Sequence, residues 1–248
     1  MESSPRILRT DRLFEKYYYS DPEFVDGTTQ FHQLCQKYIP AGSKILEIGP
    51  GPRNQTTDYL ASIGEVTGAD ISVETLDNRS LNRAFVYDGS VLPFENKTFD
   101  ACVSNFVLEH VEMPEKHFQE VARVLKTGGV YCLRTPNLWH YVALVSRMLP
   151  HSLHSLANPL RGLDAEAHEP YPTFYKANTK KVLARFCREF GLQITELCLI
   201  EKDPSYGRAH EILFFPMMTY ERVVNRFGLL EGFRANILAV FSKKKQNS

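Results

Sequence analysis

The amino-acid sequence predicts an α/β fold, a doubly wound and mostly parallel sheet of seven strands with helices on both faces. Three observations indicate this fold. A short apolar run at 45–48 precedes a glycine turn at 49–51, and a helix with apolar residues at Leu60 and Ile63 follows. Apolar strands and amphipathic helices then alternate, as in parallel strands joined by crossover helices. The chain of 248 residues can bury one such core with additions.

Each element follows from its local pattern. A helix from Thr28 has apolar residues at one-face spacing and stops at Pro40. Thr56 or Thr57 is expected to cap the helix after the glycine turn, and Asn178 to cap a later one. Strands are expected at residues 45–48, 66–70, from 84 onward, 99–105, 130–134, 192–200 and 236–242, and further helices from 114, from 178 and over 212–227.

The chain reads as a single domain, residues 1–248, with four parts. We expect an N-terminal helical cap over 1–42 and a cofactor-binding core over 43–136. Residues 137–177 form a lid-like insertion, because prolines and a glycine interrupt any regular pattern there. Residues 178–248 complete the sheet.

Composition narrows the function classes. The 29 basic and 29 acidic residues cancel, so the sequence lacks the basic excess usual in nucleic-acid enzymes. The five cysteines have no paired or metal-like spacing, which indicates reduced thiols and a cytoplasmic protein. The polar N-terminus does not read as a signal peptide, and no apolar run approaches 18 residues, so no transmembrane segment is expected.

The glycine turn indicates a nucleotide-type cofactor with a cationic part. Glycine allows a tight turn and a close approach of the backbone to a ligand. A dinucleotide fingerprint would place a third glycine at position 54, where this sequence has Asn54. Glu47 lies two residues before Gly49, where its carboxylate would repel a pyrophosphate and attract an amine. A plain strand-to-helix turn is the alternative.

Two further carboxylates follow strand ends. Asp70 lies 19 residues after Gly51, at a spacing that suits an acceptor of hydrogen bonds from ribose hydroxyls. Asp88 and Gly89 precede the sequence Leu-Pro-Phe. Taken separately, an acid at a strand end and an Asp-Gly turn are both common in proteins.

Together these motifs, with Phe99–Asn105 and the sequence Val-Leu-Glu-His-Val after it, resemble the class I S-adenosylmethionine-dependent methyltransferases, in particular a methyltransferase type 11-like domain. The resemblance covers about residues 43–136 and implies a Rossmann-like fold and S-adenosylmethionine as cofactor. The third glycine that many members have at the position of Arg53 is absent. The cofactor-binding residues implied are Glu47, Gly49 and Gly51 for the methionine part, Asp70 and Ile71 for the ribose, Asp88 and Gly89 for the adenine, and Asn105 and Tyr18 nearby.

The resemblance implies methyl transfer to a small-molecule, glycan or lipid-like acceptor, at oxygen rather than nitrogen or carbon. The motifs of nucleic-acid amino methylation and cytosine C5 methylation are absent from the sequence. A non-catalytic S-adenosylmethionine-binding subunit or sensor remains the main alternative from another class, N- or C-methyl transfer is an alternative within this class, and a nicotinamide oxidoreductase is a weaker one. The apolar helix at 212–227 would also suit an oligomer contact, so a homodimer is considered.

An acceptor hydroxyl needs a base, and histidine titrates in the useful range. The insertion holds four of the eight histidines at spacings that match no familiar metal site, so no metal is expected. His168, followed by Glu169 and near Tyr171, is our candidate base, with His140 next. His110 lies in the Val-Leu-Glu-His-Val sequence that resembles the family, where many members have a histidine, so it is expected to be structural. His117 is expected to be solvated. The acceptor is expected beneath residues 17–32 and 138–176.

Overall fold

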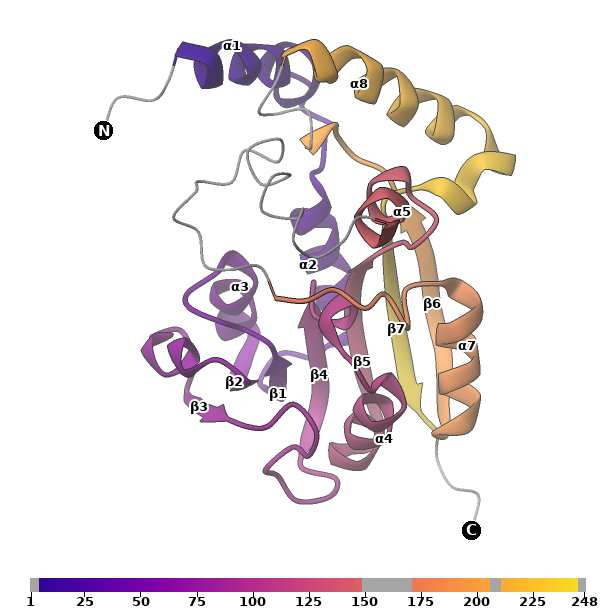
Figure 1. Cartoon of the computed structure of the whole chain (residues 1–248). Helices are drawn as coiled ribbons and strands as arrows, with labels where there is room; N and C mark the ends of the chain where they lie inside the picture. Colours follow the sequence, from indigo (N-terminus) through magenta and orange to yellow (C-terminus); the bar gives the residue numbers. More distant parts are fainter. Residues whose placement is uncertain (1–4, 149–170, 206–210, 245–248) are drawn as a thin grey trace.

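The computed structural model of the chain describes residues 5–148, 171–205 and 211–244. Its centre is a seven-stranded sheet in the order β3-β2-β1-β4-β5-β7-β6, with helices on both faces (Figure 1). The predicted α/β fold is therefore confirmed. The division into a cap, a core, an insertion and a C-terminal part stays a prediction.

The strands lie close to where the sequence predicts them. They are β1 (Ser43–Ile48), β2 (Gly64–Asp70), β3 (Arg83–Val86), β4 (Phe99–Asn105), β5 (Leu125–Pro136), β6 (Leu192–Ile200) and β7 (Asn236–Lys243). The first five strands pair in parallel, and β7 pairs antiparallel with both β5 and β6. The carboxyl ends of β1, β2, β4 and β5 therefore meet at one edge, where ligands bind in open α/β sheets.

The helices are α1 (Pro5–Phe14), α2 (Gly27–Tyr38), α3 (Gln55–Ile63), α4 (Pro114–Val124), α5 (Tyr141–Met148), α7 (Lys180–Glu189) and α8 (Glu211–Arg226), with short helical turns η1 (Glu15–Tyr19), η2 (Val73–Asp77), η3 (Leu108–His110) and η7 (Gly228–Phe233). Two predicted caps are wrong by one to three residues. Asn54 caps α3 by accepting from the N–H groups of Thr56 and Thr57, and Thr179 caps α7. The side chain of Asn178 instead donates to the hydroxyl of Thr135.

Each face of the sheet has its own apolar core. One core joins the strands to α4 and α7, where the Phe118 and Phe186 rings lie 5.1 Å apart. The other joins them to α2 and α3, with Phe31 and Leu60 fully buried. Alternate residues of β1 supply both cores, because successive strand side chains point to opposite faces. Packing of helices on both faces of the sheet fixes the strand ends that line the site.

The environment of His117 differs from the expectation. The sequence pattern places it on the polar side of α4, yet its side chain is buried and its Nε2 lies 2.9 Å from the Tyr131 hydroxyl. The cause is that α4 packs against both the sheet and α7, so its buried arc is wider than a one-sided helix needs. Burial lowers the pKa of His117 to about 4. The cysteines are free thiols, and four of the five are buried, as expected.

The first and last long helices lie together beyond the carboxyl end of the parallel strands (Figure 1). Phe14 and Tyr18 pack there against Phe214 of α8, the Phe14 and Phe214 rings lying 5.2 Å apart. Helices α1 and α8 thus form a small apolar layer above the ligand-binding edge. Among the described helices, none combines the length and the apolar character that a membrane span requires.

Candidate functional site

The glycine turn after β1 has a backbone that only glycine adopts easily. Gly49 and Gly51 have φ angles of 71° and 56°, in the left-handed region. A Cβ on Gly49 would also lie 2.5 Å from Cγ2 of Val107, which is a steric overlap. Gly51 has no such neighbour within 4 Å among the described residues, so its requirement is conformational. The turn therefore brings bare backbone to the sheet edge.

Asp70, the last residue of β2, holds this turn in place. Its Oδ2 accepts from the N–H of Gly51 at 2.7 Å, and its Oδ1 accepts from the N–H of Ser72 at 2.9 Å. Arg53, at the position of the absent third glycine, extends outward to Asp58. The missing glycine thus leaves the turn intact, because Arg53 does not enter it.

Glu47 presents a buried carboxylate to a cavity of about 350 Å³, which we name the Glu47 cavity; Thr28, Gly49 and Asn105 also line it. The side chain of Glu47 is buried, and its Oε2 has no hydrogen-bond partner in the described part of the chain. Burial raises the pKa of Glu47 to about 7. A buried acceptor without a partner is costly, so this site suits a ligand ammonium group.

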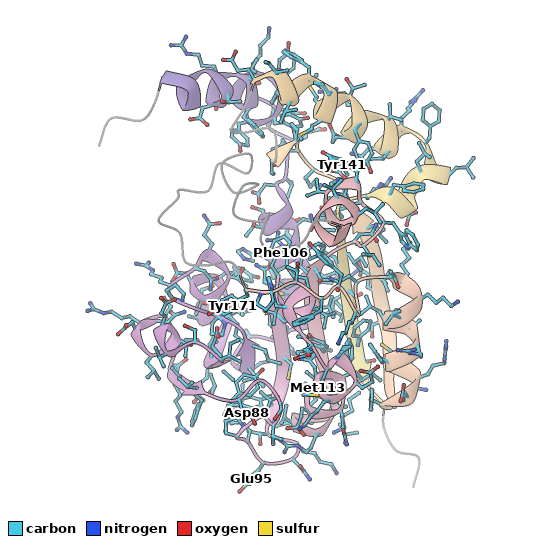
Figure 2. All side chains as sticks on the ribbon, viewed as in Figure 1. Asp88, Glu95, Phe106, Met113, Tyr141 and Tyr171 are labelled. Carbon is cyan, nitrogen blue, oxygen red and sulfur yellow. The ribbon has the colours of Figure 1, made fainter. Side chains whose placement is uncertain are left out.

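A second cavity of about 300 Å³, the Asp88 cavity, adjoins the first at Gly49. Asp70, Ile71 and Gly89 line it, and three more of its lining residues, Asp88, Met113 and Tyr171, are labelled in Figure 2. Its walls are mainly apolar and aromatic, as a purine ring requires. Three local donations, from the N–H and Oγ of Ser90 and the N–H of Val91, hold the Asp88 carboxylate and lower its pKa to about 2.

The third cavity, the Arg134 cavity, has a volume of about 490 Å³. It lies between the start of α2, the end of β5 and the segments that follow β6 and precede α7. It shares Thr28 with the Glu47 cavity and His110 with the Asp88 cavity. The three cavities therefore adjoin around the carboxyl ends of β1, β4 and β5.

Three buried ionisable groups line the Arg134 cavity. Arg134 donates from Nε to Oδ1 of Asn105 at 2.8 Å, and burial lowers its pKa to about 10. Glu109 accepts from the Thr135 hydroxyl at 3.2 Å, and Glu201 accepts from the N–H of Ala235 at 2.8 Å. Burial raises the pKa of Glu109 to about 7 and that of Glu201 to about 8.

Of the predicted bases, His140 is buried away from the three cavities. None of them has His140 in its described lining, and its Nε2 lies 3.5 Å from Oε2 of Glu201. Burial lowers its pKa to about 4. His168 lies outside the described residues. Among the described histidines, the one that borders two cavities is His110, which the sequence analysis assigned to structure.

The ring orientation of His110 leaves one nitrogen for chemistry. Its Nδ1 lies 3.0 Å from the carbonyl oxygen of Pro172. Because a carbonyl can only accept, Nδ1 carries the hydrogen and Nε2 keeps a lone pair in the neutral ring. Burial lowers the pKa of His110, so the neutral form prevails at neutral pH.

The structure brings together most of the predicted cofactor residues, but not Tyr18. Glu47, Gly49, Asp70, Ile71, Asp88, Gly89 and Asn105 line the first two cavities, and Gly51 is tied to Asp70. The Tyr18 hydroxyl donates to Oε2 of Glu221 on α8 at 3.0 Å, and Tyr18 lines none of the three cavities as described. Sequence reasoning missed Glu109, Arg134 and Glu201, whose only signal was a charge at a strand end or in an apolar run.

Comparison with known proteins agrees with this geometry. Residues 46–133 match the model of a family described as a methyltransferase domain. The chain is 35% identical over 96 residues to a demethylmenaquinone methyltransferase of Clavibacter sepedonicus, covering 36% of this chain and 39% of that protein. It is 34% identical over 129 residues to a sarcosine/dimethylglycine N-methyltransferase of Aphanothece halophytica, covering 47% of each.

The fold also resembles solved structures over most of its length. An S-adenosylmethionine-dependent methyltransferase from Mesorhizobium loti aligns with a TM-score of 0.54 and 17% identity, covering 85% of this chain and 96% of that one. At this identity the likeness shows the fold alone. The chain spans about half the length of the first curated relatives it matches, at 51%, 43% and 58%.

Proposed function

We propose, from the premise that this chain belongs to the class I S-adenosylmethionine-dependent methyltransferases, that it transfers a methyl group to a small-molecule acceptor. S-adenosylmethionine is the methyl donor of this class. The observation that carries the proposal is the buried, unpartnered Oε2 of Glu47 beside the glycine turn. A cofactor with an ammonium group, a ribose and an adenine matches the Glu47 cavity, Asp70 and the Asp88 cavity in that order along the edge.

The donor would be held at both ends by residues of this chain. Glu47 would bind the ammonium group, and the bare backbone at Gly49 would allow the close approach that a Cβ would block. Asp70 would accept from the ribose hydroxyls through lone pairs that Gly51 and Ser72 leave open. When bound, the donor supplies a sulfonium methyl group that needs no further activation.

The acceptor would occupy the Arg134 cavity, which adjoins both donor cavities at Thr28 and His110. Residues near Asp26 on one side and Thr173 on the other line it, in keeping with the expectation of an acceptor beneath 17–32 and 138–176. Holding the acceptor in line with the methyl group can supply about 7–11 kcal/mol of the barrier reduction. Positioning is therefore the main task of the protein.

We propose transfer to oxygen, with a histidine that takes the acceptor proton. Such a base contributes roughly 10²–10⁴-fold. His110 is placed for this role because it borders the Asp88 and Arg134 cavities and has Nε2 free of a proton in the neutral ring. His168, the candidate from the sequence, stays a proposal, and His140 a weaker one because of its burial behind Glu201.

The acceptor class and the setting are also proposals. The printed names of the two curated relatives fit a small molecule, and we extend this to glycan or lipid-like acceptors of natural-product or glycan biosynthesis in the cytoplasm. A homodimer through α8 and η7 stays a proposal, supported by the exposed Ile212, Phe227 and Leu229.

The deciding experiment has two steps. Calorimetry with S-adenosylhomocysteine and with NAD should show binding of the first alone. Cell extracts incubated with the protein and isotope-labelled S-adenosylmethionine should then yield a product heavier by one labelled CH₂, found by mass spectrometry. Binding without release of S-adenosylhomocysteine from any extract would favour the non-catalytic subunit or sensor. Binding of NAD instead would defeat the proposal.

A further inference from the structure

Arg134 is a buried cation that has no carboxylate within ion-pair distance in the described part of the chain. It stands near the end of β5, has 6% of its surface exposed and lines the Arg134 cavity. No ion pair of Arg134 occurs in residues 5–148, 171–205 and 211–244. An unpaired buried charge is costly, and proteins normally pair it or bind a ligand to it.

The hydrogen bonds of the guanidinium leave part of it unused. A guanidinium has five N–H groups. Nε donates to Asn105 at 2.8 Å, and Nη1 and Nη2 each lie 3.3 Å from the same Thr28 hydroxyl oxygen. The two Nη N–H groups that point at Thr28 are the parallel pair, the fork that binds carboxylate or phosphate, and here they share one hydroxyl oxygen at long distance. The second N–H of each Nη points outward along a flank of the guanidinium. An anion can therefore take the place of the Thr28 hydroxyl at the fork.

Neighbouring residues fix the plane of this fork. The ring of Phe106, labelled in Figure 2, lies 4.3 Å from the guanidinium carbon. Phe106 has a φ of 56°, a conformation that is costly for a residue with a Cβ and that is often found at functional sites. Gly27 lies near both Arg134 and Lys202, and the Phe31 ring lies 5.8 Å from the guanidinium carbon. Two aromatic rings therefore accompany the guanidinium.

The carboxyl groups of the same cavity are committed elsewhere. Both oxygens of Asp26 accept from the first turn of α2, and Asp203 accepts from the Ser205 hydroxyl. Glu109 and Glu201 have pKa values raised by burial, so neither is a full negative charge at neutral pH. Asp26 stays charged, because its pKa is lowered, and its carboxylate acts electrostatically on both Arg134 and Lys202. It forms an ion pair with neither in the described residues, so two cations face one carboxylate beside Gly27.

We propose that the methyl acceptor carries an anionic group, a carboxylate or a phosphate, which Arg134 binds through the parallel N–H groups of Nη1 and Nη2 with Lys202 beside it. The inference rests on the proposed function for placing the acceptor in this cavity. The donor carboxylate is the competing source of the anion. The acceptor is favoured because Arg134 lines the Arg134 cavity and is not among the described residues that line the Glu47 cavity.

The test compares the full-length wild type with Arg134→Met and Arg185→Met. Arg185 lies on α7 with its side chain 57% exposed, so its variant controls for loss of a positive charge. Thermal unfolding is followed with S-adenosylhomocysteine saturating, at constant ionic strength, with inorganic phosphate, benzoate or neutral benzyl alcohol. We expect phosphate and benzoate to raise the Tm of wild type and Arg185→Met by at least about 2 °C. Neither anion should shift Arg134→Met, and benzyl alcohol should not separate the variants.

Two further readouts separate binding from structure. Without ligands, Arg134→Met should unfold at the same or a higher temperature than wild type, because an apolar side chain replaces an unpaired buried charge. A purely structural arginine would give a lower Tm. The affinities of Arg134→Met for S-adenosylhomocysteine and for methylthioadenosine, which lacks the amino-acid part, should both stay within about threefold of wild type.

Several results would overturn the inference. One is the absence of a Tm shift of wild type with either anion, and another is a response of Arg134→Met equal to that of wild type. A tenfold loss of S-adenosylhomocysteine affinity with methylthioadenosine unchanged would assign the anion to the donor and contradict our choice. If wild type fails to bind S-adenosylhomocysteine, the proposed function is contradicted instead. The anion titrations, repeated without S-adenosylhomocysteine, then test only whether Arg134 binds an anion.

Discussion

The N–H of Gly51 donates to the carboxylate of Asp70 across 2.7 Å, so the end of β2 holds the turn that follows β1. The sequence analysis assigned Asp70 to ribose binding, and the structure gives it a second task. One side chain thereby couples the shape of the glycine turn to the position of the carboxylate that we propose binds the ribose. Any change at Asp70 acts on both.

Asp70→Ala is expected to weaken S-adenosylhomocysteine binding at least tenfold. Hydrogen bonds to a charged group contribute about 1.5–3 kcal/mol each, and the variant also frees the turn. Calorimetry measures the affinity. Glu65→Ala is the control, because Glu65 lies exposed on the same strand at its far end. Unchanged affinity of Asp70→Ala would contradict the cofactor assignment.

Glu47 predicts a pH-dependent affinity for the donor. Its pKa, raised by burial to about 7, should fall when an ammonium group binds, so binding releases a proton. Affinity for S-adenosylhomocysteine should therefore rise about tenfold from pH 6 to pH 8 and then level off. In the ligand-free protein the raised pKa of Glu47 affects folding stability, and with rising pH this effect is unfavourable. It makes Glu47 reduce folding stability as the pH rises from about 4.5 to 7.

Glu47→Gln should flatten this pH dependence and bind S-adenosylhomocysteine more weakly above pH 7. Calorimetry in two buffers of different ionisation enthalpy counts the released proton. If wild type releases no proton at pH 7, the ammonium group is not bound by Glu47.

Three histidine variants separate the candidate bases once an acceptor is found. His110→Gln should lower kcat by about 10²-fold or more and remove the acidic limb of the pH profile, since a base acts in the transition state. His140→Gln should keep near-normal turnover, because burial holds His140 away from the cavities. His168→Ala tests the prediction from the sequence. Loss of turnover in His168→Ala with a normal His110→Gln would reverse our choice.

Tyr18→Phe should leave donor affinity unchanged. The Tyr18 hydroxyl is bound to Glu221, in the layer between α1 and α8. Loss of this hydrogen bond should lower the free energy of unfolding by about 0.5–1.5 kcal/mol. Urea unfolding and calorimetry on the same variant measure the two quantities. A tenfold loss of affinity at normal stability would return Tyr18 to the cofactor site.

By itself the sequence determined the strands, the glycine turn and most of the residues that line the Glu47 and Asp88 cavities. These features depend on local rules: apolar periodicity, a positive φ that requires Gly49, and Asp70 placed at a strand end. The same local rules assigned His117 to solvent and Asn178 to a helix cap, and both were wrong. The burial of a helix depends on how many neighbouring elements cover it. The apolar periodicity of its sequence does not show that number.

Only the tertiary structure decided how the Arg134 cavity, the proposed acceptor site, is built. Arg134, Glu109 and Glu201 are far apart in the sequence, and none belongs to a pattern that predicts a site. They meet because the strand order sets the ends of β4, β5 and β6 around one cavity. Burial at that meeting point then shifts their pKa values. The pKa of an ionisable residue depends on the groups that exclude water around it, and the fold determines which groups these are.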